Sequence, residues 1–211
     1  MTEMNIIYND YSIVVVNKPG GLLSVPGRGA DKLDCVVSRI RELFPQCIAQ
    51  PSVHRLDMDT SGLMVLALTA KAHKDLSMQF MNRTVRKQYS AILEGVVDKD
   101  HGEIRLPFRL DVNNRPHQIY DPVHGRLGIT LFERQKVNGD KTGILFTPLT
   151  GRTHQLRLHS SHAMGLGCPI AGDRLYGNGK PGDRLFLHAC FLGFSHPDNN
   201  EPLYFESTPW F

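Results

Sequence analysis

The pattern of apolar positions around residue 60 predicts a buried strand that follows a loop. Apolar residues run without interruption over Leu63–Leu68, whereas the preceding stretch, Val53–Gly62, has a short apolar entry of Val53 and Leu56 and is otherwise mostly polar and turn-forming. A continuous apolar run bounded by turn residues is typical of a strand buried on both faces. We therefore expect Asp57 to lie on a loop at the edge of that strand, where a rigid element holds it near a ligand.

Other elements are predicted on both sides of this segment. Two short apolar runs separated by a polar pair predict a hairpin over Ile6–Asn17. Apolar residues recur with the period of an amphipathic helix over Leu33–Phe44, and Pro45 is expected to end that helix. Thr69 is expected to cap a second helix that continues to about Asn82.

The second half of the chain reads mostly as strands. Gln88–Val97 alternates, with Tyr89, Ala91 and Leu93 on one face. Further strands are expected near 103–107, 117–121, 129–135, 143–149, 185–195 and 203–206, and a polar loop over Asp111–Gly128. Many short strands with a few helices indicate an α+β fold with a mixed, mostly antiparallel sheet.

The segment Arg152–His159 also alternates, so we read it as a strand followed by a short helix near 160–166. A strand would place Gln155, Arg157 and His159 on one face and the two leucines on the other. Arg157 is then the cation aimed toward a ligand.

Composition limits the classes of function. The 211 residues are 41% hydrophobic, with no run of the roughly 18 apolar residues that cross a membrane. The N-terminus has no signal-peptide pattern, so we expect a cytoplasmic protein without a membrane partner. Four scattered cysteines favour free thiols over disulfides or zinc.

The charge pattern permits an RNA partner without requiring one. The formal net charge is +3. Basic residues gather at Lys71, Lys74, Arg83, Arg86 and Lys87, a set that fits a phosphate-binding surface and a solvated helix face equally well.

Four motifs, taken together, resemble the RluA-type pseudouridine synthases. The segment from His54 to Leu63 resembles the family's His-Arg-Leu-Asp-x-x-Thr-Ser-Gly-Leu motif. Lys87-Gln88-Tyr89 resembles its Lys-x-Tyr motif, Gly151–His159 its Gly-Arg-x-His-Gln-Leu-Arg-x-His motif, and Lys18–Leu22 its Lys-Pro-x-Gly-Leu signature.

The resemblance implies an isomerase that converts uridine in structured RNA to pseudouridine. It implies the pseudouridine synthase fold, a mixed sheet in two lobes flanking a catalytic cleft, with no cofactor and no metal. Residues 1–211 are then a single catalytic domain without an N-terminal S4-like RNA-binding domain, expected to be a monomer. Gly20–Arg28 is most similar to the short dual-specificity subgroup, whose substrates are a 23S rRNA hairpin loop and a tRNA anticodon stem-loop.

Three residues are the catalytic candidates. A carboxylate at Asp57 can add to C6 of uracil or to C1′ of ribose, and the sequence leaves both routes open. Burial would neutralise such a nucleophile, so a fixed cation is needed, and the motif assigns that role to Arg157. Tyr89 offers a ring on which the flipped uracil can stack.

The motifs also supply candidates for substrate binding. Arg55 can fill the space that a flipped base leaves, or it can contact a phosphate. The remaining candidates come from the same motifs: His54, Thr60, Lys87, Arg152, His154 and Gln155.

Two other functions remain as alternatives. A retaining glycosidase would also attack a sugar with a carboxylate, but it needs a second carboxylate about 5–5.5 Å away, for which Asp59 is the local candidate. A non-catalytic RNA-binding module would have no use for Asp57. The glycine-rich Gly177–Gly182 lacks the strand and helix of a nucleotide site, and the histidines at 154, 159 and 162 lack an acid or thiol to complete a metal site.

Overall fold

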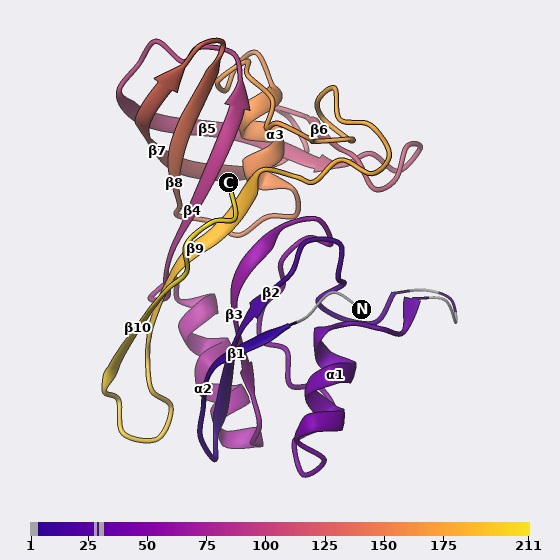
Figure 1. Cartoon of the computed structure of the whole chain (residues 1–211), viewed down its shortest axis with the longest axis vertical. Helices are drawn as coiled ribbons and strands as arrows, with labels where there is room; N and C mark the ends of the chain where they lie inside the picture. The colour runs from indigo at the N-terminus through magenta and orange to yellow at the C-terminus, as the bar shows by residue number, and fades with distance from the viewer. Residues whose placement is uncertain (1–3, 28, 30–31) are drawn as a thin grey trace. The chain divides into compact units, whose positions relative to one another are not determined.

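The computed structural model describes residues 4–27, 29 and 32–211 (Figure 1). The first three residues and Arg28, which ends the subgroup stretch Gly20–Arg28, lie outside the described residues. The chain forms two compact units. The first unit comprises the chain up to Lys87 together with His188–Trp210, and the second unit comprises Gln88–Leu187 with Phe211.

The first unit is built on strands β1 (Asn5–Asn9), β2 (Ile13–Lys18), β3 (Ser61–Ala67), β9 (Leu187–Ser195) and β10 (Pro202–Glu206). β1, β2 and β3 pair antiparallel in that order, β3 pairs parallel with β9, and β9 pairs antiparallel with β10. Every residue of β3 is buried, as the uninterrupted apolar run predicts. Each large apolar side chain buried in this way stabilises the fold by about 1.5–3 kcal/mol.

Two helices complete the first unit, and both begin at a side-chain cap. In α1 (Val36–Leu43) Cys35 and Ser38 form a reciprocal capping box, and Val36, Val37 and Ile40 are buried. In α2 (Ala70–Met81) the Thr69 hydroxyl accepts the N–H of Ala72 at 3.2 Å. A cap of this kind supplies a partner for a helix N–H that would otherwise have none. Both helices and the N-terminal hairpin confirm the sequence predictions.

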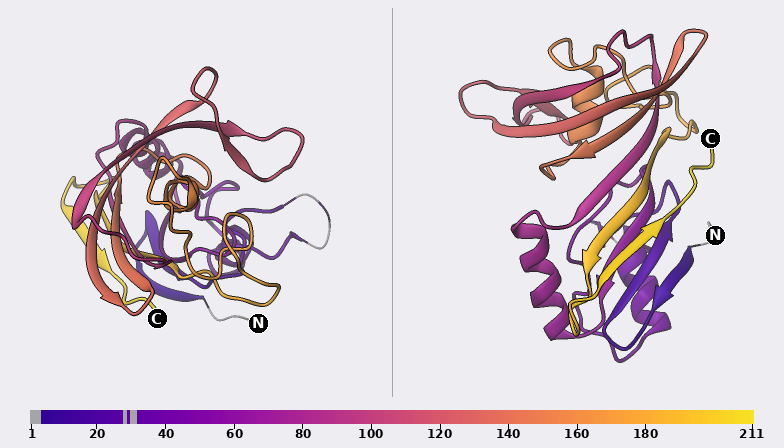
Figure 2. Two further views of the ribbon diagram at one scale, coloured as in Figure 1. Left: turned by 90° about the horizontal axis from the view of Figure 1, so that it is seen from above. Right: turned by 90° about the vertical axis from the view of Figure 1, so that its left-hand side faces the viewer.

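The second unit contains strand β4 (Arg86–Glu94) from Gln88 onward, together with β5 (His101–Leu110), β6 (Gln118–Tyr120), β7 (Arg126–Asn138) and β8 (Lys141–Pro148). They pair antiparallel in the order β4-β8-β7-β5-β6. Helix α3 (Gln155–Ser161) lies on the inner side of this curved sheet (Figure 2). Its Leu156 joins a core that includes Leu93, Phe132 and Phe146.

The fold is α+β with a mixed, mostly antiparallel sheet, as predicted, but two local predictions are wrong. Arg152–His159 is not a strand, since its second half lies in α3, and the helix expected near 160–166 begins earlier, at Gln155. The expected loop Asp111–Gly128 ends earlier, because β7 begins at Arg126, whereas β6 within it is the strand expected near 117–121.

Two further expectations concern the cysteines and the membrane. The four cysteines are free thiols, as predicted. Within the described part of the chain, none of the helices has the length and apolar character needed to cross a membrane.

Candidate active site

Asp57 lies half-buried on the loop that leads into β3. The loop is anchored on the N-terminal side of Asp57, where the Ser24 hydroxyl donates to Leu56 O at 2.7 Å and accepts the Leu56 N–H at 3.0 Å. On the C-terminal side, Asp57 O accepts the N–H of Thr60 at 3.2 Å. These bonds fix the backbone on both sides of the candidate nucleophile.

Lys18 provides a second anchor for the same loop. Its side chain is fully buried, and the ammonium donates to the carbonyl oxygens of Pro19, Leu22 and Met58 at 2.8–2.9 Å. Burial lowers the pKa of Lys18 to about 7, while the carboxylates of Asp57 and Asp59 act in the opposite direction. The lysine of the N-terminal signature thus ties that segment to the residue after Asp57, a role that the sequence analysis missed.

The Thr-Ser-Gly of the motif forms the start of β3. Thr60 is buried, and the Ser61 hydroxyl lies 2.8 Å from Nδ1 of His188 on β9. Gly62 has φ of +114°, and a Cβ there would come within 2.4 Å of Ala189 O. Glycine is required at this position because the two backbones approach closely. Thr60, a substrate-binding candidate, therefore sits inside the structural support of the Asp57 loop.

His54 and Lys87 both pack against Phe80. The His54 ring stacks on Phe80 with centroids 4.5 Å apart, and its Nε2 accepts the N–H of Val65 at 3.1 Å. Burial, and then the charge of Lys87, lower the pKa of His54 to about 3, so the ring is neutral. The Lys87 ammonium lies 5.8 Å from the Phe80 ring centroid, and burial lowers its pKa. Arg55 is exposed.

In the second unit, the candidates from the third motif lie at the start of α3. The Gln155 carboxamide accepts from the Thr150 hydroxyl and the Arg152 N–H, and it donates to Ile129 O and the Thr130 hydroxyl. The amide is therefore bonded within the protein on both of its ends. Arg152 is exposed on the turn before the helix.

Arg157 is buried and forms a two-bond ion pair with Asp173. Its Nε donates to Asp173 Oδ2 at 2.7 Å and its Nη2 to Oδ1 at 2.6 Å, with side-chain exposures of 3% and 0%. The guanidinium also lies over the Tyr176 ring, 5.4 Å from the centroid. The helical conformation means that Arg157 is oriented by this buried pair rather than by strand alternation. The predicted pairing of Arg157 with Asp57 stays a prediction.

The two histidines of the third motif have different surroundings. His154 has a positive φ of 56°, and its Nδ1 lies 2.8 Å from the Tyr176 hydroxyl. His159 is fully buried against Phe108, and neither ring nitrogen has a hydrogen-bond partner among the described residues. Burial lowers the pKa of His159 to about 4. The strand face predicted for His159 is wrong, because His159 lies in a helix.

Tyr89 lies half-buried on β4 opposite Phe146 and packs against the core of the second unit. Its register places it on the same face as Ala91 and Leu93, as the alternation predicts.

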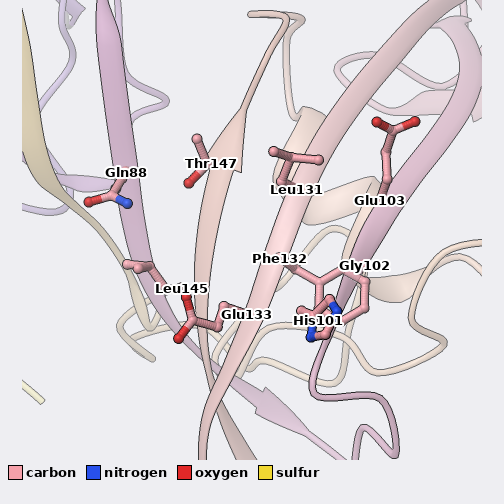
Figure 3. Close-up of a pocket in the computed structure, with 9 residues that line it drawn as sticks. All are labelled: Gln88, His101, Gly102, Glu103, Leu131, Phe132, Glu133, Leu145 and Thr147. Atoms are coloured by element: carbon pink, nitrogen blue, oxygen red, sulfur yellow. The ribbon is translucent and has the colours of Figure 1, made fainter.

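The second unit also has a concavity of about 500 Å³ on its sheet (Figure 3). Its lining includes Gln88, Leu131, Leu145 and two glutamates, Glu103 and Glu133. Gln88 adjoins Tyr89 in β4 and therefore points to the opposite face of the sheet. The carboxylates would repel RNA phosphates, so this concavity is not the candidate active site.

No group of three or more His, Cys, Asp or Glu side chains suited to a metal occurs among the residues that the structure describes. The candidate residues are thus divided. Those in the first unit are His54, Arg55, Asp57, Thr60 and Lys87, and those in the second unit are Tyr89, Arg152, His154, Gln155 and Arg157.

Comparisons with known proteins place this chain in a family. The sequence profile of RNA pseudouridylate synthases matches residues 12–162. The chain is 43% identical over 208 residues to the dual-specificity RNA pseudouridine synthase RluA of Haemophilus influenzae, covering 97% of this chain and 92% of that protein. It is 42% identical over 206 residues to RluA of Escherichia coli, covering 96% and 91%.

A solved structure agrees with the sequence matches. Human RNA pseudouridylate synthase domain containing 1 superposes with a TM-score of 0.76 at 28% identity, covering 98% of this chain and 83% of that one. The chain belongs to the RNA pseudouridylate synthase family, whose members isomerise uridine within RNA.

Proposed function

We propose that this chain forms pseudouridine in two structured RNAs, a hairpin loop of 23S rRNA and the anticodon stem-loop of tRNA, with Asp57 as the nucleophile. The observation that supports this assignment is the doubly anchored loop, on which Ser24 bonds to Leu56 and Lys18 bonds to Met58, the two neighbours of Asp57. A rigid loop beside a buried strand gives a nucleophile the fixed position that a covalent step needs. The RluA relatives, which are dual-specificity enzymes, support the choice of two RNAs.

The reaction is balanced without a redox partner. The bond from N1 of uracil to C1′ of ribose breaks, the base turns, and a bond from C5 to C1′ forms. The hydrogen on C5 leaves to water, and N1 gains a proton. Asp57 adds to C6 or to C1′ and is released at the end. In this proposal Arg157 provides the fixed cation, Tyr89 stacks on the flipped base and Arg55 fills the vacated position. The chain acts as a monomer in the cytoplasm and uses neither cofactor nor metal.

The test measures tritium release from RNA labelled at C5 of uridine. Asp57→Asn removes the nucleophile without changing the size of the side chain, so turnover should be abolished while folding and RNA binding remain. Short synthetic stem-loops that represent each RNA should both be substrates for the wild-type protein. Retention of a tenth of the wild-type turnover in Asp57→Asn would refute the nucleophile assignment.

Asp59→Asn is the matched control. It makes the same change two residues away on the same half-buried loop. We expect turnover within about threefold of wild type. If Asp59→Asn were as inactive as Asp57→Asn, a mechanism with two carboxylates would be favoured, and hydrolysis of aryl glycosides would then test the glycosidase alternative. Tight RNA binding with no tritium release from the wild-type protein would favour a binding module.

A further inference from the structure

Asp173 holds the Arg157 guanidinium by one edge. The two hydrogen bonds, Nε to Oδ2 and Nη2 to Oδ1, are 2.7 and 2.6 Å long, and both side chains are buried. Two parallel bonds between a planar guanidinium and a planar carboxylate fix the plane of the cation as well as its position. A lysine at 157 or an amide at 173 would not reproduce this geometry.

The backbone in turn holds the Asp173 carboxylate. Its Oδ1 accepts the N–H groups of Leu175 at 2.9 Å and Tyr176 at 3.1 Å. Burial raises the pKa of Asp173, but the bonds and charge of Arg157 and these two N–H groups outweigh burial, and the pKa is lowered. Asp173 is therefore an ionised and immobile support.

Tyr176 supports the guanidinium from its face. The ring centroid lies 5.4 Å from the Arg157 guanidinium carbon. The hydroxyl oxygen accepts the N–H of Gln118 at 2.7 Å, so its proton is available for His154 Nδ1 at 2.8 Å. The ring is thus fixed between β6 and the residue before α3. A cation over an aromatic face is attracted by the negative face of the ring, so this contact stabilises the position of the guanidinium.

The edge and face contacts also set the direction of the guanidinium donors that do not bind Asp173. The pair with Asp173 uses the Nε hydrogen and one Nη2 hydrogen, so Nη1 and the remaining Nη2 hydrogen have their directions set by Asp173 and Tyr176. The carboxylate offsets part of the charge of the arginine, so the cation acts mainly through donors whose directions are fixed.

We propose that Asp173 and Tyr176 are positioning residues for the pseudouridine synthase reaction, which aim the Arg157 donors at the reacting carboxylate or base. This inference rests on the proposed function of Arg157. Neither residue needs to touch the RNA. Their loss should therefore lower kcat and leave the KM for RNA unchanged.

The test compares Asp173→Asn with Asp183→Asn. Asparagine at 173 can still accept the two backbone N–H groups, but its NH2 then faces the Arg157 Nε–H, donor against donor, so the guanidinium must tilt. Misplacement of about 1 Å costs on the order of 100-fold, so we expect kcat to fall about 10- to 100-fold with KM within threefold. Asp183 also lies between α3 and β9 and accepts a backbone N–H, that of Lys180, but it is exposed. Its variant should retain kcat within twofold.

A second background separates positioning from general stability. In an Arg157→Lys protein the two-bond geometry is already lost, so adding Asp173→Asn should lower kcat by less than twofold more. If the two losses multiply instead, Asp173 does not act through Arg157 and the proposal is wrong. The proposal would also be wrong if folded Asp173→Asn had a kcat within threefold of wild type, or if only its KM for RNA changed.

Two further measurements apply if Asp173→Asn does not fold or if the proposed function itself is wrong. If Asp173→Asn does not fold, Tyr176→Leu removes the face contact while the ion pair stays, and it should lower kcat at least fivefold with KM unchanged. An unchanged kcat in Tyr176→Leu would then refute the proposal. Asp57→Asn is assayed in parallel. If it is active, the proposed function fails, whereas an inactive Asp57→Asn beside a normal Asp173→Asn refutes the positioning role alone.

Discussion

Replacing Arg157 by leucine should destabilise the second unit even where no RNA is present. The substitution leaves Asp173 buried at 0% side-chain exposure without its counter-ion. Removing one partner of a buried pair typically costs about 3–5 kcal/mol. Asp173 retains the N–H groups of Leu175 and Tyr176, which continue to solvate the carboxylate, so we expect the lower end, about 3 kcal/mol.

The pH dependence gives this prediction a sign. In the wild-type protein the pKa of Asp173 is lowered, so its contribution to stability is present above the unfolded value of about 3.9 and is lost as pH falls through the lower folded value. In Arg157→Leu, burial without the guanidinium raises the pKa of Asp173. As pH falls, Asp173 in the folded variant therefore binds a proton at a higher pH than it does in the unfolded chain, and this uptake removes the buried charge. The loss of stability relative to wild type should be largest near pH 8 and should shrink toward pH 5.

Urea unfolding followed by far-ultraviolet circular dichroism is the assay. The single tryptophan, Trp210, belongs to the first unit, so its fluorescence alone would not report the second. The double variant Arg157→Leu/Asp173→Asn removes the buried charge and should recover about 1–3 kcal/mol. Equal stability of the single and double variants at pH 8, or a difference that does not change with pH, would refute the reasoning.

Two further predictions concern packing and RNA binding. Gly128→Ala should cost about 1–3 kcal/mol, measured by urea unfolding, because the new Cβ would lie 2.8 Å from Nε2 of the buried His159. Lys74→Glu/Arg86→Glu should raise the KM for RNA and flatten its dependence on salt, with kcat retained, because both side chains are exposed and each phosphate contact adds roughly one unit of log–log salt slope.

Each has a control in the same protein. A Cβ at Gly143 would lie 3.2 Å from the flexible side chain of Lys136, so Gly143→Ala should cost little, and an equal loss in both variants would contradict the packing argument. Lys136→Glu/Lys141→Glu makes the same charge change on the β7–β8 hairpin. An equal effect of Lys136→Glu/Lys141→Glu on the salt slope would show that the net charge of the protein, rather than the positions of Lys74 and Arg86, governs RNA binding.

The local pattern of apolar and polar residues was sufficient to predict an element that buries one face, as α2 does, or both faces, as β3 does. The apolar run of β3 and the Thr69 cap of α2 both depend on neighbours in sequence, and both elements were predicted, although β3 begins at Ser61, before the apolar run. The cluster of basic residues from Lys71 to Lys87 predicted an RNA-binding surface only in part. Lys71 pairs with Asp198, which is distant in sequence, and Lys87 is half-buried beside Phe80. Neither contact can be inferred from neighbouring residues.

Helix α3 shows why the rest was not predictable. Gln155–Ser160 is buried on every side, so the helix has no polar face and its sequence shows no 3.6-residue period. Two of its polar side chains bond to partners distant in sequence, Gln155 to Thr130 and Arg157 to Asp173. The alternation of leucines with polar residues therefore resembled a strand.

Asp173 was not predicted because it lies in the glycine-rich connection 165–182 between α3 and β9, for which no helix, strand or motif was expected. One local signal could have found it. An aspartate two and three residues before Leu175 and Tyr176 is placed to accept both backbone N–H groups in an Asx-turn, which orients the carboxylate.

The discontinuity of the first unit has a consequence during translation. Ser61 and its partner His188 are separated by 127 positions, whereas the second unit is almost entirely one continuous stretch. Domains begin to fold as the chain leaves the ribosome, and contacts between distant residues form late. Asp57 and β3 are thus synthesised early, but β9, which pairs with the start of β3, is synthesised only near the end of the chain. A nascent chain stalled before His188 contains the nucleophile without the Ser61–His188 hydrogen bond, so the support of the nucleophile is completed only near the end of synthesis.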